Sequence, residues 1–509
     1  MMFCKSFRAC LLTAFLFMAA LPALHASEDA SAFRDVLALA GVGPDELAQF
    51  GQDAGQISDV WQAKDWSLLT QILYRLRQYP DEQLQQWTRA TQPQRWFDEP
   101  AAHGGQLVEV SAQVESWEAL SVPQEIAQAQ GLSTVYRCQF GSDSPAFTGT
   151  LISRKIPRRW KSGEIKGEAV RFRGVIVQVS KSPAQGRVLL VTDRLAWYPR
   201  QGVPMGQLLL ARQGMDVALL DEVVHRQPFV FPSISREGEA FYGCLQALGR
   251  MNHEELAARC KENVATAADK WRKAQPDLRK QYKAAQEQLA QTATPKKRKD
   301  LQKKEAALRE RQSVAAAVIK QSEQGLSSLG PLFVHPESEV GELIQLEGVA
   351  RRAVRIAVPE RPKIGAYFEI EIFTPEAKYL ESRPVVCCVN RLPTGFPEGD
   401  VLSEPVRVSG IFFKSWLYRT REVVKPGEGE TGRQRRLYTP LILADAPTWL
   451  QVSESRQSPW ALWGGIAFVL ALAAMWLTMA RSARRERRAR QAGAARILLD
   501  ESSKRIERG

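Results

Sequence analysis

Histidine and cysteine often act as metal ligands, bases and nucleophiles, so their spacing is the first indication of a metal site or a catalytic site. Beyond residue 26 the chain has four histidines and five cysteines, and no two histidines have the spacing of a metal-ligand pair. Cys387 and Cys388 are adjacent, which is poor geometry for a disulfide. The sequence also has no Gly-x-Ser-x-Gly motif and no phosphate-binding loop. We therefore expect no catalytic residue, no metal site, no cofactor and no enzymatic activity. The less favoured alternative is an enzyme whose site is assembled from residues that the sequence does not connect.

Two sets of side chains could instead bind a partner or a ligand. The first is an uninterrupted basic run that could contact an acidic partner: Lys296, Lys297, Arg298 and Lys299. The second is a set of aromatic rings that could stack on sugars: Trp117, Trp160, Trp416 and Tyr418. The alternatives are a solvated helical spacer for the first set and ordinary core packing for the second.

The elements that must position these residues recur at a constant offset. Identical residues recur 236 positions apart, among them Gly105 and Gly341, Pro123 and Pro359, Pro157 and Pro393, Gly163 and Gly399, Arg171 and Arg407, and Gly174 and Gly410. Apolar positions follow the same offset, as Leu107 and Leu343 do. One offset held across about seventy residues predicts a duplicated domain.

Each copy contains five short runs of alternating apolar and polar residues, which predict half-buried strands. Five strands in about 100 residues favour a small Greek-key barrel, with a sandwich of five to seven strands as the alternative. In each copy a glycine precedes alternating apolar residues, at 105–110 and 341–346, and a later run of this kind contains Gly174 or Gly410. This spacing resembles the OB-fold. The resemblance implies a ligand face bordered by the loop between strands four and five.

That loop differs between the two copies. Trp197 and Trp449 follow the fifth strand of each copy, but they lie 252 positions apart, so the second copy has 16 extra residues. These fall within 418–436, a stretch rich in glycine and charged residues. We expect an extended, mobile hairpin loop there, and a tolerated surface insertion is the alternative.

Helical sequence precedes both predicted barrels, because a leucine pattern in 31–89 returns in part at 245–256. The second copy also has an insertion at 253–325, which is rich in good helix formers and interrupted at 292–295. We expect two helices folded into a hairpin, with the basic run at its tip.

The positive charge of the chain is concentrated outside the predicted barrels. The formal net charge is +13, of which residues 261–320 carry +9, residues 481–509 carry +6 and the first 26 residues carry +2. The rest of the chain is therefore at −4. Because a nucleic-acid-binding face needs basic residues on the folded surface, we expect no nucleic-acid partner.

Two segments indicate a membrane protein. Residues 9–20 are apolar, follow Lys5 and Arg8 and precede small residues, which predicts a signal peptide ending at Ala26. Residues 460–480 carry no charge and are long enough to span a bilayer once. Six arginines follow within 481–490 and place the C-terminal tail in the cytoplasm. We expect a single-pass protein of the bacterial cytoplasmic membrane with its N-terminus outside the cytoplasm.

Together these patterns predict an α+β protein: two helix-plus-small-β-barrel (OB-like) repeats, a helical hairpin insert and one C-terminal transmembrane helix. The expected segments are a signal peptide (1–26), a helical lead-in (27–100), a first barrel (101–200), a second lead-in (201–256), the basic hairpin (257–325), a second barrel (330–452), the transmembrane helix (459–480) and a basic cytoplasmic tail (481–509). The function we expect is a non-catalytic scaffold or protein-binding module at the outer face of the membrane, with an envelope protein as partner. The alternative is binding of envelope glycans by the barrel faces.

Overall fold

The structure is a computed structural model in which the chain forms two compact units, Met1–Trp449 and Leu450–Gly509. It describes residues 32–50, 61–90, 92–143, 146–163, 165–180, 187–228, 235–291, 294–361, 363–376, 384–423, 434–451 and 459–506. The first unit contains two separate six-stranded sheets together with helices, so the expected α+β class is confirmed at this level. The predicted signal peptide lies outside the described residues.

The first sheet closes on itself. Its strands are β1 (Leu107–Ser121), β2 (Thr134–Asp143), β3 (Ala146–Ser153), β4 (Glu168–Ser180), β5 (Arg187–Thr192) and β6 (Ala196–Trp197). They are hydrogen-bonded in the order β1-β2-β3-β5-β4-β6, and β1 also pairs with β4. The first five strands therefore form a closed cycle. Only the β3–β5 pairing in this cycle is parallel.

The second sheet repeats this order of pairing. Its strands are β7 (Leu343–Val358), β8 (Gly365–Phe373), β9 (Val385–Val389), β10 (Glu404–Val423), β11 (Gln434–Ala444) and β12 (Thr448–Trp449). Strands β7, β8, β9, β11 and β10 form a cycle that β7 and β10 close, and β9 pairs with β11 in parallel. The sixth strand in each sheet was not predicted, since its two residues are too few to show alternation.

The two sheets pair the same positions under the offset of 236. Val108 lies opposite Gly174 in the first sheet, and Ile344 lies opposite Gly410 in the second. Trp197 Nε1 donates to Glu168 at 2.8 Å, and its counterpart Trp449 donates to Glu404 at 2.9 Å. The ring of Trp449 also meets Phe396 edge-on, with the ring centroids 5.4 Å apart. Each tryptophan thus fastens the short sixth strand to its sheet.

The first lead-in packs against the first sheet. Its helices are α2 (Ala32–Leu39), α3 (Pro44–Gln49), α4 (Ala63–Gln78), α5 (Asp81–Trp87), α6 (Pro93–Asp98) and α7 (Pro100–His103), and α8 (Gln124–Gln130) joins β1 to β2. Leu37, Leu69 and Ile72 are fully buried with Val175 and Leu189 of the sheet in one core cluster. Apolar residues at helical spacing therefore cover the sheet, as expected for amphipathic helices.

The second lead-in joins the two sheets. It consists of α9 (Met205–Arg212), the 3₁₀ helix η3 (Val217–Glu222) and α10 (Arg236–Gly249), with α13 (Gly330–Val334) and η4 (Pro336–Ser338) following the hairpin. The largest core cluster contains buried residues of both sheets and of α9, η3 and α10. Phe241 on α10 meets Tyr367 at 5.3 Å and Phe413 at 5.7 Å between ring centroids, both edge-on.

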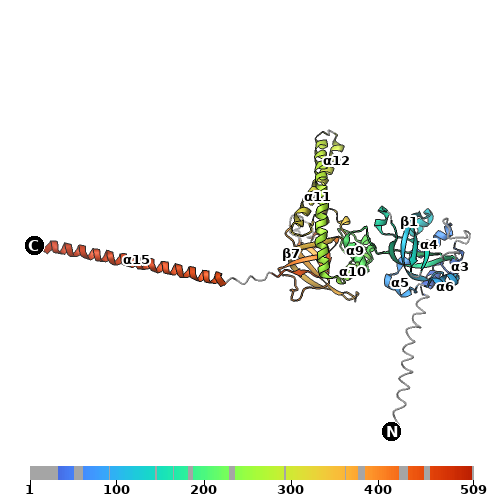
Figure 1. Cartoon of the computed structure of the whole chain (residues 1–509), viewed down its shortest axis with the longest axis horizontal. Coiled ribbons are helices and arrows are strands. Elements are labelled where there is room, and N and C mark those ends of the chain that lie inside the picture. The colour runs from blue at the N-terminus through green and yellow to red at the C-terminus, as the bar shows by residue number, and fades with distance from the viewer. Residues whose placement is uncertain are drawn as a thin grey trace, which may run out of the picture. The chain divides into compact units, whose positions relative to one another are not determined.

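The insertion forms two long helices, α11 (His253–Gln291) and α12 (Pro295–Ser322), which lie side by side (Figure 1). Leu278, Ala285, Leu308 and Ala315 form their shared apolar cluster. Pro276 lies inside α11 without ending it. The start of α11 is held against the second sheet, where Asn263 Nδ2 donates to the Leu343 carbonyl at 3.0 Å.

The expected loop at 418–436 is partly wrong. Strands β10 and β11 remain paired as far as Val423 and Gln434, so residues 418–423 and 434–436 belong to strands. Backbone hydrogen bonds between the two strands hold these residues in the sheet, and such pairing cannot be recognised from a glycine-rich, charged sequence. Residues 424–433 lie outside the described part.

The second unit contains α15 (Pro459–Ile506). Within it, Gly465–Arg485 is long and apolar enough to cross a membrane, and none of the window is buried. Trp463, Phe468 and Trp476 are each 65–70% exposed, unlike the apolar residues of the first unit's core. The prediction of one candidate C-terminal span is confirmed at this level.

Candidate functional site

The basic run lies at the start of α12, at the end of the hairpin away from the sheet. Pro295 occupies the first position of α12 and fixes where the helix begins. The side chains of Lys296, Lys297, Arg298 and Lys299 are all exposed. The hairpin therefore presents four cations to solvent at one end, as the sequence predicts.

The four aromatic residues do not form one surface. Trp160 is 2% exposed and meets Trp197 edge-on at 6.2 Å between ring centroids, so neither face of its indole is open to a sugar. Trp117 is half-buried and meets Tyr136 edge-on at 5.9 Å. Trp416 is half-buried on β10 of the other sheet, and the side chain of Tyr418 lies outside the described part.

The five cysteines of the described chain are buried and free. Burial raises the pKa of Cys138 to about 12, and it also raises the pKa of Cys387 and Cys388. These thiols stay protonated near neutral pH and are poor nucleophiles. Cys387 and Cys388 lie on β9 opposite Ile442 and Leu443 of β11, in a strand whose residues are all buried.

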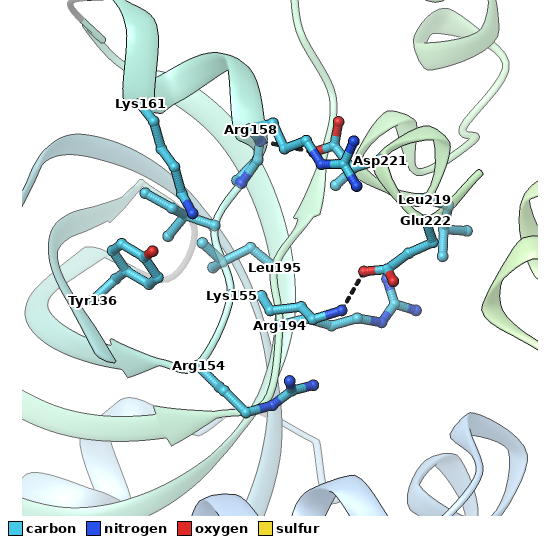
Figure 2. Close-up of a pocket in the computed structure, with 13 residues that line it drawn as sticks. Tyr136, Arg154, Lys155, Arg158, Lys161, Arg194, Leu195, Leu219, Asp221 and Glu222 are labelled. Carbon is cyan, nitrogen blue, oxygen red and sulfur yellow. Dashed lines mark hydrogen bonds and ion pairs between the residues drawn. The ribbon is translucent and has the colours of Figure 1, made fainter. Parts of the chain in front are cut away.

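A cavity of about 210 Å³ lies at the end of the first sheet where β3 and β5 terminate (Figure 2). Strand β3 ends at Ser153, whose hydroxyl donates to the Lys155 carbonyl at 2.6 Å and turns the chain. Pro157 then starts the 3₁₀ helix η2 (Arg158–Ser162). The Arg158 N–H donates to Asp221 at 2.7 Å, which ties η2 to η3 across the cavity. We call this cavity the basic pocket.

Basic side chains dominate the polar lining of the basic pocket. Five line it: Arg154, Lys155, Arg158, Lys161 and Arg194. Asp221 and Glu222 of η3 are the two acidic residues of the lining. Lys155 Nζ lies 2.5 Å from Glu222, and Lys161 Nζ lies 4.8 Å from the ring centroid of Tyr136. Burial raises the pKa of Asp221. The lining is thus formally positive.

Carboxylates behind the lining hold two of the arginines. Arg154 Nε lies 2.5 Å from Asp193, which is 7% exposed. Arg194 pairs with the buried Asp216 and lies 2.7 Å from Asp81 of α5. Although burial lowers the pKa of Arg194, the Asp216, Asp81 and Glu239 carboxylates raise it above its ordinary value. Both guanidinium groups are therefore fixed in position by charge-assisted hydrogen bonds.

Sequence reasoning missed the basic pocket. The signal was present, because residues 154–161 contain five bases and no acid. The net charge of −4 for the rest of the chain hides this local run of bases. Acidic residues farther along the chain offset the bases in that sum, among them Asp193, Asp216, Asp221 and Glu222. A count in a short window would have found the run.

A scan against protein-family models, a search of curated proteins and a search of solved structures each find no match to this chain.

Proposed function

We propose that this chain is a non-catalytic, membrane-anchored scaffold of the bacterial cell envelope, in which the α11–α12 hairpin is the arm that binds a protein partner. One observation carries the proposal. The hairpin is anchored at its base and ends in an exposed basic run that takes no part in any core. Four charges on the end of two packed helices are well placed to meet an acidic surface.

The base and the tip of the hairpin differ in burial. Leu256, Cys260 and Val264 near the base are each at most 5% exposed, and Asn263 binds the second sheet. Beyond Ala285 the residues of α11 that the structure describes are exposed or half-buried. The base supports the arm, and the tip is available for contact.

We also propose that both sheets are OB-type barrels that arose by duplication. Two features support this: the shared closed cycle of five strands with one parallel pairing, and the shared positions of Gly174 and Gly410. For topology, we propose that the N-terminal part lies outside the cytoplasm and the arginine-rich end of α15 lies inside. Protease added outside spheroplasts should then digest the first unit and spare the C-terminal tail.

The arm is tested by photo-crosslinking in intact membranes. A photoreactive residue replaces Gln302, which is exposed on α12 near the basic run. The variant changes Lys296, Lys297, Arg298 and Lys299 to Gln. The matched control changes four exposed bases nearer the base of the hairpin to Gln: Lys273, Arg279, Lys280 and Lys283.

We expect a discrete crosslinked protein that the tip variant loses and the control keeps. The crosslink should also weaken with salt, because the Debye length falls from ~10 Å at 0.1 M to ~3 Å at 1 M ionic strength. Equal loss in both variants would point to general charge attraction. An unchanged crosslink in the tip variant would exclude the basic run as the contact.

A further inference from the structure

The basic pocket is independent of the proposed arm, because it lies on the first sheet and involves no residue of the hairpin. We propose that the basic pocket binds a phosphate group of a phosphoester. The ligand class is identified by the number, type and placement of the cations around a small concave space.

The fold does not require these bases, as the second sheet demonstrates. The offset of 236 places Asn390 at the position of Arg154, Arg391 at that of Lys155 and Thr394 at that of Arg158. Pro397 stands at the position of Lys161. The same turn after β9 is thus built with one base in place of four. The amide of Asn390 donates to the Leu245 carbonyl of α10 at 2.8 Å, so this position contacts a helix in the second sheet and does not carry a base.

The cations of the basic pocket approach from separate elements. Arg154 and Lys155 follow β3, Arg158 and Lys161 belong to η2, and Arg194 follows β5 (Figure 2). Bases contributed by three separate segments suit a tetrahedral oxyanion, which accepts hydrogen bonds from several directions, whereas a planar carboxylate is matched by a single arginine fork. This arrangement favours phosphate over carboxylate.

A ligand must compete with the acidic residues of the lining for the basic side chains. Glu222 holds Lys155, and Asp221 holds the backbone of Arg158, so both carboxylates come from η3. Arg158 and Lys161 are exposed, and Lys161 rests over the Tyr136 ring. A phosphate group entering the pocket therefore meets Arg158 and Lys161 first and then competes with Glu222 for Lys155.

The apolar part of the lining adds a second requirement. Ile156, Leu195 and Leu219 line the pocket beside the bases. A volume of about 210 Å³ admits a phosphate with only a few further atoms of its ester group. The pocket thus suits the phosphorylated end of a larger molecule or a small phosphoester.

The test uses the full-length protein in a non-ionic detergent and isothermal titration calorimetry at constant ionic strength. The probes are inorganic phosphate and glycerol phosphate, with chloride and acetate as competitors. Vesicles of neutral lipid with and without phosphatidic acid form a second arm, which distinguishes a lipid headgroup from a soluble phosphoester.

The variant is the double substitution Arg158→Ala and Lys161→Ala. Arg159→Ala is the matched control, because Arg159 is exposed on the same turn but does not line the pocket. We expect saturable phosphate binding that the double variant weakens at least tenfold and the control changes less than twofold. Neutralising Lys296–299 should leave phosphate binding unchanged, which separates this inference from the proposed arm.

Three outcomes would overturn the inference. They are a lack of saturable phosphate binding, equal weakening by Arg159→Ala, and equal competition by acetate, which would assign the pocket to carboxylates. Circular dichroism verifies folding of each variant. If the double variant does not fold, Lys161→Gln alone decides the matter, since that side chain is exposed and has no backbone role.

Discussion

Lys414 is a charged residue inside the second sheet. Its side chain is 0% exposed, and its Nζ lies 2.6 Å from Glu237 of α10. Burial lowers the pKa of Lys414, and the Glu237 carboxylate opposes this effect. The position follows a bulge in β10, and Gln178 follows the corresponding bulge in β4. The second sheet thus carries an ion pair where the first has a neutral side chain.

Removing the acidic partner should cost more stability than removing the base. Glu237→Gln leaves a buried ammonium without its carboxylate, and we expect a loss of about 3 kcal/mol. Lys414→Gln installs the residue of the first sheet, and Glu237 keeps its bond from the Val224 N–H, so we expect a smaller loss. Urea denaturation of the full-length protein in detergent measures both. The opposite ranking would mean that the ammonium is not charged in the folded protein.

His225 should make stability depend on pH. Its Nδ1 accepts the Ser415 N–H at 3.1 Å, which requires the neutral ring, and burial lowers its pKa from 6.5. The unfolded chain therefore binds the proton more readily. Stability is greatest above pH 6.5 and falls as the pH drops from there toward the lower native pKa. Facing groups include Glu337, Lys414, Arg226 and Arg158.

The measurement is the urea midpoint at pH 7.5 and pH 5.5. His225→Gln keeps an acceptor for Ser415 but cannot titrate, so its midpoint should change less between the two pH values than that of the native protein. A pH response identical in the variant would assign the effect to other groups.

Individual site residues were only partly predictable. The basic run at Lys296 was found because it is continuous in sequence and ends up exposed. For Trp160 the sequence leaves stacking and core packing open, because its burial against Trp197 depends on a contact between residues 37 positions apart. The basic pocket is lined by residues of β2, η2 and η3 and of the turns after β3 and β5, and the acidic residues of its lining come from η3.

At the scale of elements, Gly410 and Gly174 occupy matching positions under different constraints. A Cβ on Gly410 would lie 2.2 Å from the Leu443 carbonyl oxygen and 2.9 Å from the Ala444 Cβ. A Cβ on Gly174 would lie 3.3 Å from the Leu190 Cβ. Backbone cannot move aside as a side chain can, so an added Cβ is accommodated less easily at Gly410 than at Gly174.

Gly410→Ala should therefore destabilise the protein by about 3 kcal/mol or more, and Gly174→Ala by about 1 kcal/mol or less. Thermal and urea unfolding followed by circular dichroism compare the two in the same background. Equal losses would show that the close approach relaxes without cost.

The contacts at the base of the hairpin determine which part of it can be deleted without a loss of stability. Cys260 is fully buried, and its thiol points to the Gly410 carbonyl at 3.7 Å. Deleting 258–322 would remove this packing together with the Asn263 contact. The base of the hairpin therefore packs against the second sheet, a contact that the sequence did not reveal, because the first copy has no such insert.

Replacing 286–304 with a short glycine-rich linker should leave the melting temperature unchanged, because this segment contributes no fully buried side chain among the residues described. Deleting 258–322 should lower the melting temperature. Differential scanning calorimetry compares the two deletions. A large loss from the shorter deletion would make the whole hairpin part of the folded core.

The sequence predicts the order of the main elements, because alternation locates the strands and helical spacing locates the lead-ins, and the offset of 236 relates the two copies. It did not predict β6, β12 or the extension of β10 to Val423. These depend on pairing across the sheet, which leaves little trace in a single strand. The packing of Phe241 against the second sheet also depends on tertiary contacts alone.

At the scale of the whole molecule, one core cluster contains residues of both sheets and of the lead-in between them. Apolar contacts that are shared between two bodies couple their stabilities. We expect calorimetry of the full-length protein to show one main unfolding transition for the first unit. Phe241→Ala, which removes the ring that meets Tyr367 and Phe413, should lower this transition and split it in two. Two transitions in the native protein would show that the sheets unfold independently.

Trp449 is the last residue of the first unit, and the chain continues from it toward α15. If α15 anchors the chain in a membrane as proposed, tension on it enters the first unit at β12, whose two residues pair with Val406 and Arg407 of β10. Such a strand peels one pair at a time, without the resistance that a long ladder offers when it is sheared. The indole bond to Glu404 and the contact with Phe396 then act as a mechanical latch. Under the proposed anchoring, we expect β12 to detach first while the two closed cycles of strands stay paired.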